Sequence, residues 1–405
     1  MTSNEPSSRL ADPGLVESVA AMMNRAWTEP GFCVPNGEVY PHQWLWDSCF
    51  HSVVWATLDP SRARTEVANA LANIGATGFV PHMTYWTDPD AHAELWARAK
   101  TSSITQPPMW GLALSEIAAH GETLDDALLD QAARGLIHLL ENRPRSSGGL
   151  VSVLHPWETG CDDSARWDGW STTPFSSPPF DRAGWKTDKV RLVGSLVFDD
   201  NGAPIDNRHF AIGSVGFSSL VAWNCELLAP LVALAADPEV AARARGLLAG
   251  RDELTAAVQA RWDDDRTTWW DEPLRGGARP SCGARTLDSM LALLVDPRPD
   301  MFDQLVEPEA FGAPFGPRGV HRAEATYEPD QYWRGPAWPQ LTYVLWRAAQ
   351  QGERNGLIDP SIPRRLAAGL VDGARRSGLA EYWNPETGEG RGAAPQSWAG
   401  LAACV

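Results

Sequence analysis

Apolar residues recur at a spacing of three to four along most of this chain, which is the pattern of helices that each bury one face. Short turns alternate with long loops rich in Gly, Pro and Trp, as in a series of helical hairpins. An open solenoid would normally carry a sequence repeat, and we find none. We therefore predict an all-α fold, an (α/α)6 barrel whose helical hairpins form a ring with long loops at one mouth. The expected helices span residues 14–27, 44–57, 61–74, 106–119, 124–141, 210–236, 238–262, 284–294, 299–307, 335–351, 361–376 and 395–404.

Residues that commonly start and end helices support two of these boundaries. Asp59-Pro60 and Asp359-Pro360 each place a capping carboxylate before a proline, which suits the first turn of a helix. Gly378 follows the second of these helices, where a glycine C-cap is common.

The long connections between the expected helices are the informative ones, because loops of this length inside a compact domain are usually functional. The longest, 144–209, is rich in proline and later in basic residues. We interpret it as a loop excursion that covers one barrel mouth as a lid; a linker between two domains is the alternative. Since the hydrophobic pattern resumes after it without a change in composition, we predict one catalytic domain over 1–405.

Residues 157–168 combine acidic and aromatic side chains more densely than any other segment. Four carboxylates, one arginine and two tryptophans fall within them. Sugar chemistry needs one carboxyl group that stays protonated near neutral pH, and apolar walls and neighbouring negative charges raise a carboxyl pKa. The alternative is a solvated acidic loop that happens to contain tryptophan.

Three other segments share this chemistry: 40–51, 332–339 and 381–388, the last followed by Gln396-Ser397-Trp398. Each combines aromatic residues with a carboxylate or polar group at a junction between a loop and a helix. Such distant segments can meet only if the helices form a ring with these loops on one face. The sequence therefore predicts a single pocket with aromatic walls.

The composition fits a small sugar as the ligand. The 20 tryptophans are far more than usual, and indole faces stack on pyranose rings while the N–H reaches a hydroxyl. The net charge of −17 argues against nucleic acid and anionic membranes, because both require a basic surface. An anionic substrate would need a local group of Arg or Lys.

The six cysteines are scattered without a CxxC pair, which argues against a zinc site or a disulfide framework. The first residues lack the basic and apolar regions of a signal peptide, and no apolar run reaches the roughly 20 residues of a membrane span. We expect a cytoplasmic protein with no metal and no cofactor.

The four segments resemble glycoside hydrolase family 63 and its relatives, the trehalases and other (α/α)6-barrel glycosidases. Trp44-Leu45-Trp46-Asp47, residues 160–168, residues 332–338 and residues 381–388 look like the family's blocks and occur in its order, from about Tyr40 to Trp398. The compact length, with no additional β-sandwich, is most similar to the bacterial mannosylglycerate and glucosylglycerate hydrolases. The third block lacks the Gln-Trp-Asp form of the trehalase signature, which argues against a trehalase.

The resemblance implies an inverting hydrolase of α-glycosides, with Asp162 as general acid and Glu381 as general base. Inversion requires two carboxyl groups on opposite faces of the sugar, roughly 6.5–9.5 Å apart, and residues from separate barrel loops can meet that requirement. Asp163 is the alternative acid and Glu386 the alternative base.

The family pattern also indicates residues of the sugar subsite. Asp47 is either a ligand for sugar hydroxyls or a residue of a helix N-terminus, and His82 and Gln106 either line the subsite or bond within the structure. We expect Glu158 and Asp168 to cap a helix or pair with Arg166. The predicted substrate-binding residues are Tyr40, Trp44, Trp46, Asp47, His82, Gln106, Arg166, Trp333, Arg334 and Trp338.

The aglycone is a separate question. If it carries a carboxylate, as glycerate does, one cation of the 144–209 segment should fold over the pocket and contact it, with arginine preferred for its paired donors. The alternative is that these cations only solvate the loop. A neutral α-linked disaccharide is the rival substrate; a sugar epimerase, expected to use paired histidines, and a sugar-binding protein without catalysis are rival functions. The candidate cations are Arg182, Lys186, Lys189, Arg191 and Arg208.

Overall fold

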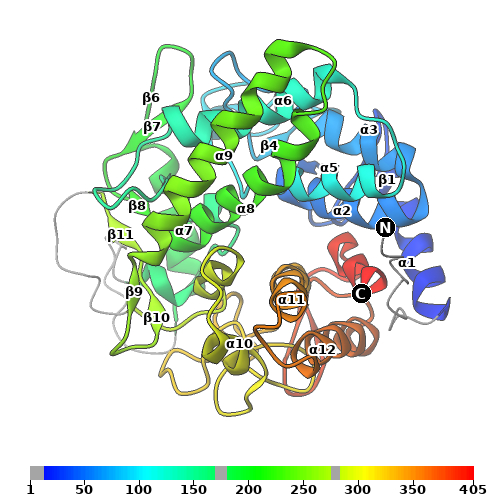
Figure 1. Ribbon diagram of the computed structural model, residues 1–405, viewed down its shortest axis with the longest axis vertical. Helices are drawn as coiled ribbons and strands as arrows, with labels where there is room; N and C mark the ends of the chain where they lie inside the picture. The colour runs from blue at the N-terminus through cyan, green and yellow to red at the C-terminus, as the bar shows by residue number, and fades with distance from the viewer. Residues whose placement is uncertain (1–12, 169–179, 275–282) are drawn as a thin grey trace.

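A closed ring of helical segments forms the centre of the protein (Figure 1). The computed structural model describes residues 13–168, 180–274 and 283–405. Each inner segment packs against the next, and the last packs back on the first, so the ring is complete within the described residues. In order, the inner segments are α2 (Leu45–Leu58), α5 (Trp110–Ala119), α8 (Val215–Val232), η4 (Ser289–Leu294), α11 (Pro339–Arg354) and η5 (Ser397–Cys404).

An outer layer of helices surrounds this ring. Five of them follow their inner partners along the chain, whereas α1 packs against η5 from the opposite end of the sequence. The blue and red ends of the ribbon accordingly lie side by side in Figure 1. The (α/α)6 prediction is confirmed. The outer helices are α1 (Pro13–Ala26), α3 (Pro60–Leu71), α6 (Asp126–Ile137), α9 (Pro238–Gln259), α10 (Pro299–Val306) and α12 (Ser361–Ser377).

Burial distinguishes the two layers. Every residue of α2 from Leu45 to Ala56 is buried, because this helix has neighbours on all sides. The outer helix α12 buries Leu366 and Leu370 and exposes arginines on its other face. Inner helix α8 is long and apolar enough to cross a membrane, yet 78% of it is buried inside the protein, so we interpret it as a core helix of the ring.

The predicted caps are present. Asp59 accepts a hydrogen bond from the Arg62 backbone N–H at 3.3 Å, with Pro60 in the first turn of α3. Gly378 ends α12 with φ at +72°, a conformation that glycine adopts without strain. Two predicted helices differ in kind: the inner segments expected at 284–294 and 395–404 are 3-10 helices, η4 and η5.

The segment 144–209 is not a structureless loop, and this prediction is corrected. Its described part contains helix α7 (Arg182–Val193) and the hairpin of β6 (Leu196–Phe198) and β7 (Pro204–Asn207). The helix was missed because two of its five buried residues, Asp188 and Lys189, are charged, which hides its apolar period. The proline-rich residues 171–179 lie outside the described part.

Short antiparallel strand pairs fasten the long loops. β3 (Gln43–Trp44) pairs with β4 (Met83–Thr84), with Trp44 opposite Met83. β12 (Tyr382–Trp383) pairs with β13 (Gly390–Arg391) and forms a bridge to Ala337. The remaining elements are β1 (Trp27–Thr28), β2 (Phe32–Cys33), α4 (Ala93–Trp96), η1 (His138–Asn142), β5 (Ser152–Val153), η2 (Pro156–Thr159), η3 (Ala165–Trp167), β8 (Ile212–Gly213), β9 (Trp262–Asp263), β10 (Thr268–Trp269) and β11 (Glu272–Pro273), of which β11, β8 and β5 form one sheet.

Candidate active site

Side chains from all four segments singled out in the sequence (40–51, 157–168, 332–339 and 381–388), called the aromatic–carboxylate segments below, meet in one cavity of about 120 Å³. A cavity volume of roughly 10–15 Å³ holds one water, so this cavity has room for about ten waters, which suits one sugar unit. Three carboxyl groups line the cavity: Asp162 and Glu381 from separate loops, and Asp47 from the first turn of α2. Its lining is Pro35, Tyr40, Trp44, Trp46, Asp47, His82, Gln106, Trp157, Gly160, Asp162, Tyr332, Trp333, Glu381, Gln396 and Trp398.

Asp162 follows the tight turn that ends η2. Gly160 adopts φ +72° there against the Trp46 ring, and a side chain at this position would collide with that ring. The backbone carbonyl of Asp162 accepts a hydrogen bond from the Trp185 indole at 3.0 Å. Burial raises the pKa of Asp162 to about 7, opposed by Lys189 and assisted by Asp163 and Glu381. A large share of Asp162 is therefore protonated at neutral pH, as a proton donor requires.

Glu381 directly precedes strand β12 and is almost completely buried. Its Oε1 accepts a hydrogen bond from the Tyr40 hydroxyl at 3.1 Å, and its Oε2 accepts one from the Ala393 backbone N–H at 2.9 Å. Burial raises the pKa of Glu381, while the Ala393 and Tyr40 donors and the charge of Arg182 lower it. These donors favour the ionised form, because they hydrogen-bond to the carboxylate.

The neighbouring acids Asp163 and Glu386 are engaged elsewhere. Asp163 is buried, does not line the cavity, and pairs with Lys189 and with Arg182. Glu386 is more than a third exposed and bonds the Arg318 guanidinium at 2.6 Å, again outside the cavity. This geometry supports Asp162 and Glu381 over the two alternatives.

The aromatic wall has two layers. The rings of Trp333 and Trp338 stack with centroids 3.5 Å apart at 4°, and Trp338 in turn stacks on Tyr382 at 4.6 Å. Trp333 faces the cavity and Trp338, fully buried, supports it from behind. We therefore do not propose Trp338 as a substrate contact.

Two predicted arginine contacts are also outside the lining. Arg166 pairs with Asp271 and with Asp288, at 3.2 Å for the latter. Arg334 binds Asp168 through two donors, at 2.7 and 2.6 Å. Both guanidinium groups are thus occupied by carboxylates, and the expected pairing of Asp168 with Arg166 is wrong.

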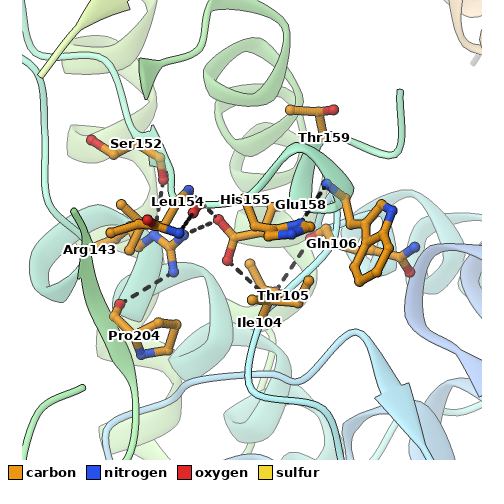
Figure 2. A network of polar contacts seen from close by, with 12 residues as sticks. Ile104, Thr105, Gln106, Arg143, Ser152, Leu154, His155, Glu158, Thr159 and Pro204 are labelled. Carbon is orange, nitrogen blue, oxygen red and sulfur yellow. Dashed lines mark hydrogen bonds and ion pairs between the residues drawn. The ribbon is translucent and has the colours of Figure 1, made fainter. Parts of the chain in front are cut away.

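The expected pairing of Glu158 with Arg166 is wrong too, because Glu158, in η2 just before Asp162, pairs with Arg143 (Figure 2). Both side chains are buried. The Glu158 carboxylate also accepts from the backbone N–H groups of Leu154 at 2.6 Å and Thr105 at 3.3 Å. Since Thr105 precedes Gln106, this ion pair fixes a cavity residue against the loop that carries the acid.

Two further polar residues line the cavity where the sequence predicted them. Burial lowers the pKa of His82 to about 3, so its ring is neutral, and its Nδ1 bonds the Ser102 hydroxyl at 2.5 Å. Asp47 lies in the first turn of α2, and burial raises its pKa to about 7, with His51 opposing. Both can hydrogen-bond sugar hydroxyls without bringing a permanent full charge into the cavity.

Six lining residues were absent from the predicted site, and besides Pro35 and Gly160 these are four aromatic or amide residues whose signal the sequence contained. These four lie within or directly beside the aromatic–carboxylate segments. Taking every aromatic or amide residue of those segments as a candidate would have found them. They are Trp157, Tyr332, Gln396 and Trp398.

Beneath the cavity, a buried hydrogen-bond chain joins three elements of the ring. His51 of α2 bonds Glu66 of α3 at 2.7 Å and Ser397 of η5 at 2.6 Å. Cys33 lies close enough for a metal to bind with His51 and Glu66, but its sulfur already accepts from the Trp55 indole at 3.2 Å. We interpret the cluster as a structural link and propose no metal there.

Similarity to known proteins covers nearly the whole chain. Residues 40–399 match the family described as the mannosylglycerate hydrolase MGH1-like glycoside hydrolase domain. The chain is 28% identical to the glucosylglycerate hydrolase of Mycolicibacterium hassiacum, over 90% of this chain and 91% of that protein. It is also 28% identical to the mannosylglycerate hydrolase of Thermus thermophilus, over 91% and 94% of the two chains.

The fold is similar to a solved structure as well. The crystal structure of the GH63 mannosylglycerate hydrolase from Thermus thermophilus, in complex with Tris and D-glycerate, superposes with a TM-score of 0.79. Sequence identity is 25%, and the match covers 96% of this chain and 99% of that one.

Proposed function

This chain belongs to the mannosylglycerate hydrolase MGH1-like glycoside hydrolase family, and from that premise we propose that it hydrolyses an α-glycoside of glycerate, glucosylglycerate or mannosylglycerate, with inversion. That it is a hydrolase of glycosidic bonds follows from the family and excludes the epimerase and the non-catalytic sugar-binding protein. The substrate, the stereochemistry and the residue roles are the proposal.

The observation that carries the mechanism is the contrast between two carboxyl groups in one cavity. Asp162, with a pKa of about 7, donates its proton to the glycosidic oxygen as the bond to the anomeric carbon breaks. Ionised Glu381, whose carboxylate accepts from the Tyr40 hydroxyl and the Ala393 N–H, takes a proton from the water that attacks the opposite face. Exchange of both protons with solvent restores the enzyme.

The remaining lining residues provide a subsite for one hexose. Trp333, backed by its stacked partner, offers a rigid apolar face for the ring. Asp47, His82 and Gln106 contribute hydrogen-bonding groups for hydroxyls. Tyr40, Trp44 and Trp46 form the rest of the proposed wall.

A carboxylate on the aglycone needs a cation at the mouth, and Arg182 meets this condition best among the five candidates. Its guanidinium lies 4.1 Å from the ring centre of Tyr332, a cavity residue. More than half of its side chain is exposed, so it can turn toward a ligand. Lys189 is buried and pairs with Asp163, and Arg191 pairs with Asp188. Lys186 and Arg208 are exposed, and within the described part of the chain neither side chain bonds a cavity residue. We propose that α7 acts as a lid of a single catalytic domain and that Arg182 binds the glycerate carboxylate.

The experiment that tests this function compares glucosylglycerate, mannosylglycerate and neutral α-linked disaccharides, with the product anomer followed by NMR. We expect a glycosylglycerate to be preferred and the β-anomer to form first. Arg182→Met should raise KM about tenfold or more for the glycosylglycerate and leave a neutral α-glucoside unchanged, since a charged hydrogen bond contributes about 1.5–3 kcal/mol. Preference for a disaccharide, or equal effects of Arg182→Met on both classes, would identify a neutral substrate. An α-anomer as first product would contradict inversion.

A cytoplasmic location stays a prediction, which fractionation of cells that express the chain would test.

A further inference from the structure

Next to the proposed general acid lies a carboxylate with no contact to the cavity. Asp163 is buried and follows Asp162 directly, yet its oxygens bond the Lys189 ammonium and, at 3.4 Å, the Arg182 guanidinium. Both cations belong to α7, at least 19 positions farther along the chain. The loop that carries Asp162 therefore faces two cations of α7, and the carboxylate of Asp163, next to Asp162 in the chain, pairs with both.

Lys189 is placed to act on the acid electrostatically. Its side chain is nearly fully buried, and its Nζ lies 5.8 Å from the ring centre of Trp157, a cavity residue. The Lys189 carbonyl accepts from His155 Nε2 at 2.8 Å, and the Trp185 indole bonds the Asp162 carbonyl at 3.0 Å, so α7 is fixed to this loop at two points.

Between the two cations, Lys189 has the stronger influence. Arg182 is more than half exposed, and water screens the field of an exposed charge, whereas the field of a buried charge is screened far less. Without Asp163, the buried Lys189 ammonium would stabilise ionised Asp162 and lower its pKa. An acid shifted in this way would lose its proton below neutral pH.

We propose that Asp163 and Lys189 form a compensated buried charge pair that keeps the adjacent acid protonated near neutral pH. Asp163 is thus a positioning and tuning residue that acts through Lys189 and does not touch the substrate. This inference rests on the proposed role of Asp162 as general acid. The other groups that face Asp162 are Arg182, Glu381 and the phenols of Tyr40 and Tyr332.

The test uses two substitutions that remove opposite charges. Asp163→Asn leaves Lys189 uncompensated, so the alkaline limb of the kcat/KM profile should move to lower pH by about one unit. Lys189→Met leaves Asp163 paired only with the largely exposed Arg182, and this weaker compensation should move the same limb to higher pH by up to about one unit. The double variant removes both charges and should return the limb to near its wild-type position. A role in folding alone does not predict opposite shifts that cancel.

Lys186→Met removes the same charge from an exposed site on α7 and should leave the limb in place. Lys189→Arg, which keeps the charge, should do the same. If Lys189→Met does not fold, Asp163→Asn and the double variant still carry the test. An NMR titration of the labelled Asp162 carboxyl in each variant measures the same shifts without turnover.

The outcomes separate this inference from the proposed function. An active Asp162→Asn enzyme would remove the general-acid assignment itself. An inactive Asp162→Asn enzyme, combined with unshifted profiles and Asp162 titrations in Asp163→Asn and Lys189→Met, would overturn the charge-pair inference alone. Shifts of equal sign in the two single variants would also overturn it.

Discussion

The two loops that carry the proposed acid and base are held in opposite ways. Around Asp162, the contacts are ionic: Asp163 with Lys189, Asp168 with Arg334 and Glu158 with Arg143. Glu381 itself is held by neutral hydrogen bonds, from the Tyr40 hydroxyl, the Ala393 N–H and the Trp398 indole, which bonds the Glu381 carbonyl at 2.9 Å. The ion pair of the same loop, Glu386 with Arg318, lies outside the cavity and is partly exposed.

This difference matches what each group must do. Two carboxyl groups in one cavity need different protonation states, and charges change a pKa more strongly than neutral donors do. In the loop that carries Asp162, removal of one charged neighbour, such as Lys189 or Asp163, should therefore change the pKa of the acid. The neutral donors to both Glu381 oxygens fix the direction of the base and offset part of the rise in its pKa that burial causes.

Removing the carboxyl groups themselves should have the largest effect. Asp162→Asn and Glu381→Gln keep the size of each side chain but remove the proton donor or acceptor, so kcat should fall about 10²–10⁴-fold in each. Steady-state kinetics with circular dichroism as the check of folding measures this. Asp163→Asn should lose much less, and near-normal turnover of either catalytic variant would refute the assignment.

Breaking an ionic contact of the acid loop should cost more stability than breaking a neutral link near the base. Arg143→Met leaves Glu158 buried without its partner, which should lower the free energy of unfolding by about 3–5 kcal/mol. Ser397→Ala, which removes the hydroxyl bonded to His51, should cost about 1 kcal/mol. Urea denaturation of the two variants compares these values.

The double variant Arg143→Met/Glu158→Gln provides the control, since it removes both charges together. It should be more stable than Arg143→Met, because no unpaired buried charge is left. Equal losses for Arg143→Met and Ser397→Ala would mean that the two loops are not held differently.

The smallest effect is expected at the base. The Tyr40 hydroxyl lowers the pKa of Glu381, so Tyr40→Phe should raise that pKa. Because the base must be ionised, the acidic limb of the pH profile should move to higher pH, by up to about one unit. The alkaline limb, which follows loss of the Asp162 proton near pH 7, should move less. A pH–rate profile of the variant shows both limbs, and a fixed acidic limb would exclude this role of Tyr40.

Much of the fold was predictable because helix periodicity and caps are local properties. Asp59 and Gly378 mark helix ends through contacts with their own neighbours in sequence. The four segments could be placed in one pocket because a ring brings loops of its hairpins to the same face. Helix α7 was missed since Asp188 and Lys189 are buried through ion pairs, which no apolar pattern reveals.

The partners of charged residues could not be predicted from sequence. Arg166 lies two positions from Asp168, yet its partners Asp271 and Asp288 come from more than 100 positions away. Trp333 and Trp338 are equally good candidates for a sugar wall in sequence, and only their stacking order decides which one faces the cavity.

The closure of the ring by η5 and α1 links the cavity to the order of synthesis. A ribosome releases the acid, the base and most of the aromatic wall before it releases Gln396 and Trp398, which complete the lining. Until residues 397–404 emerge, the nascent chain holds both carboxyl groups but no enclosed site between them. An enclosed cavity therefore requires η5 to be docked beside α1 and α2.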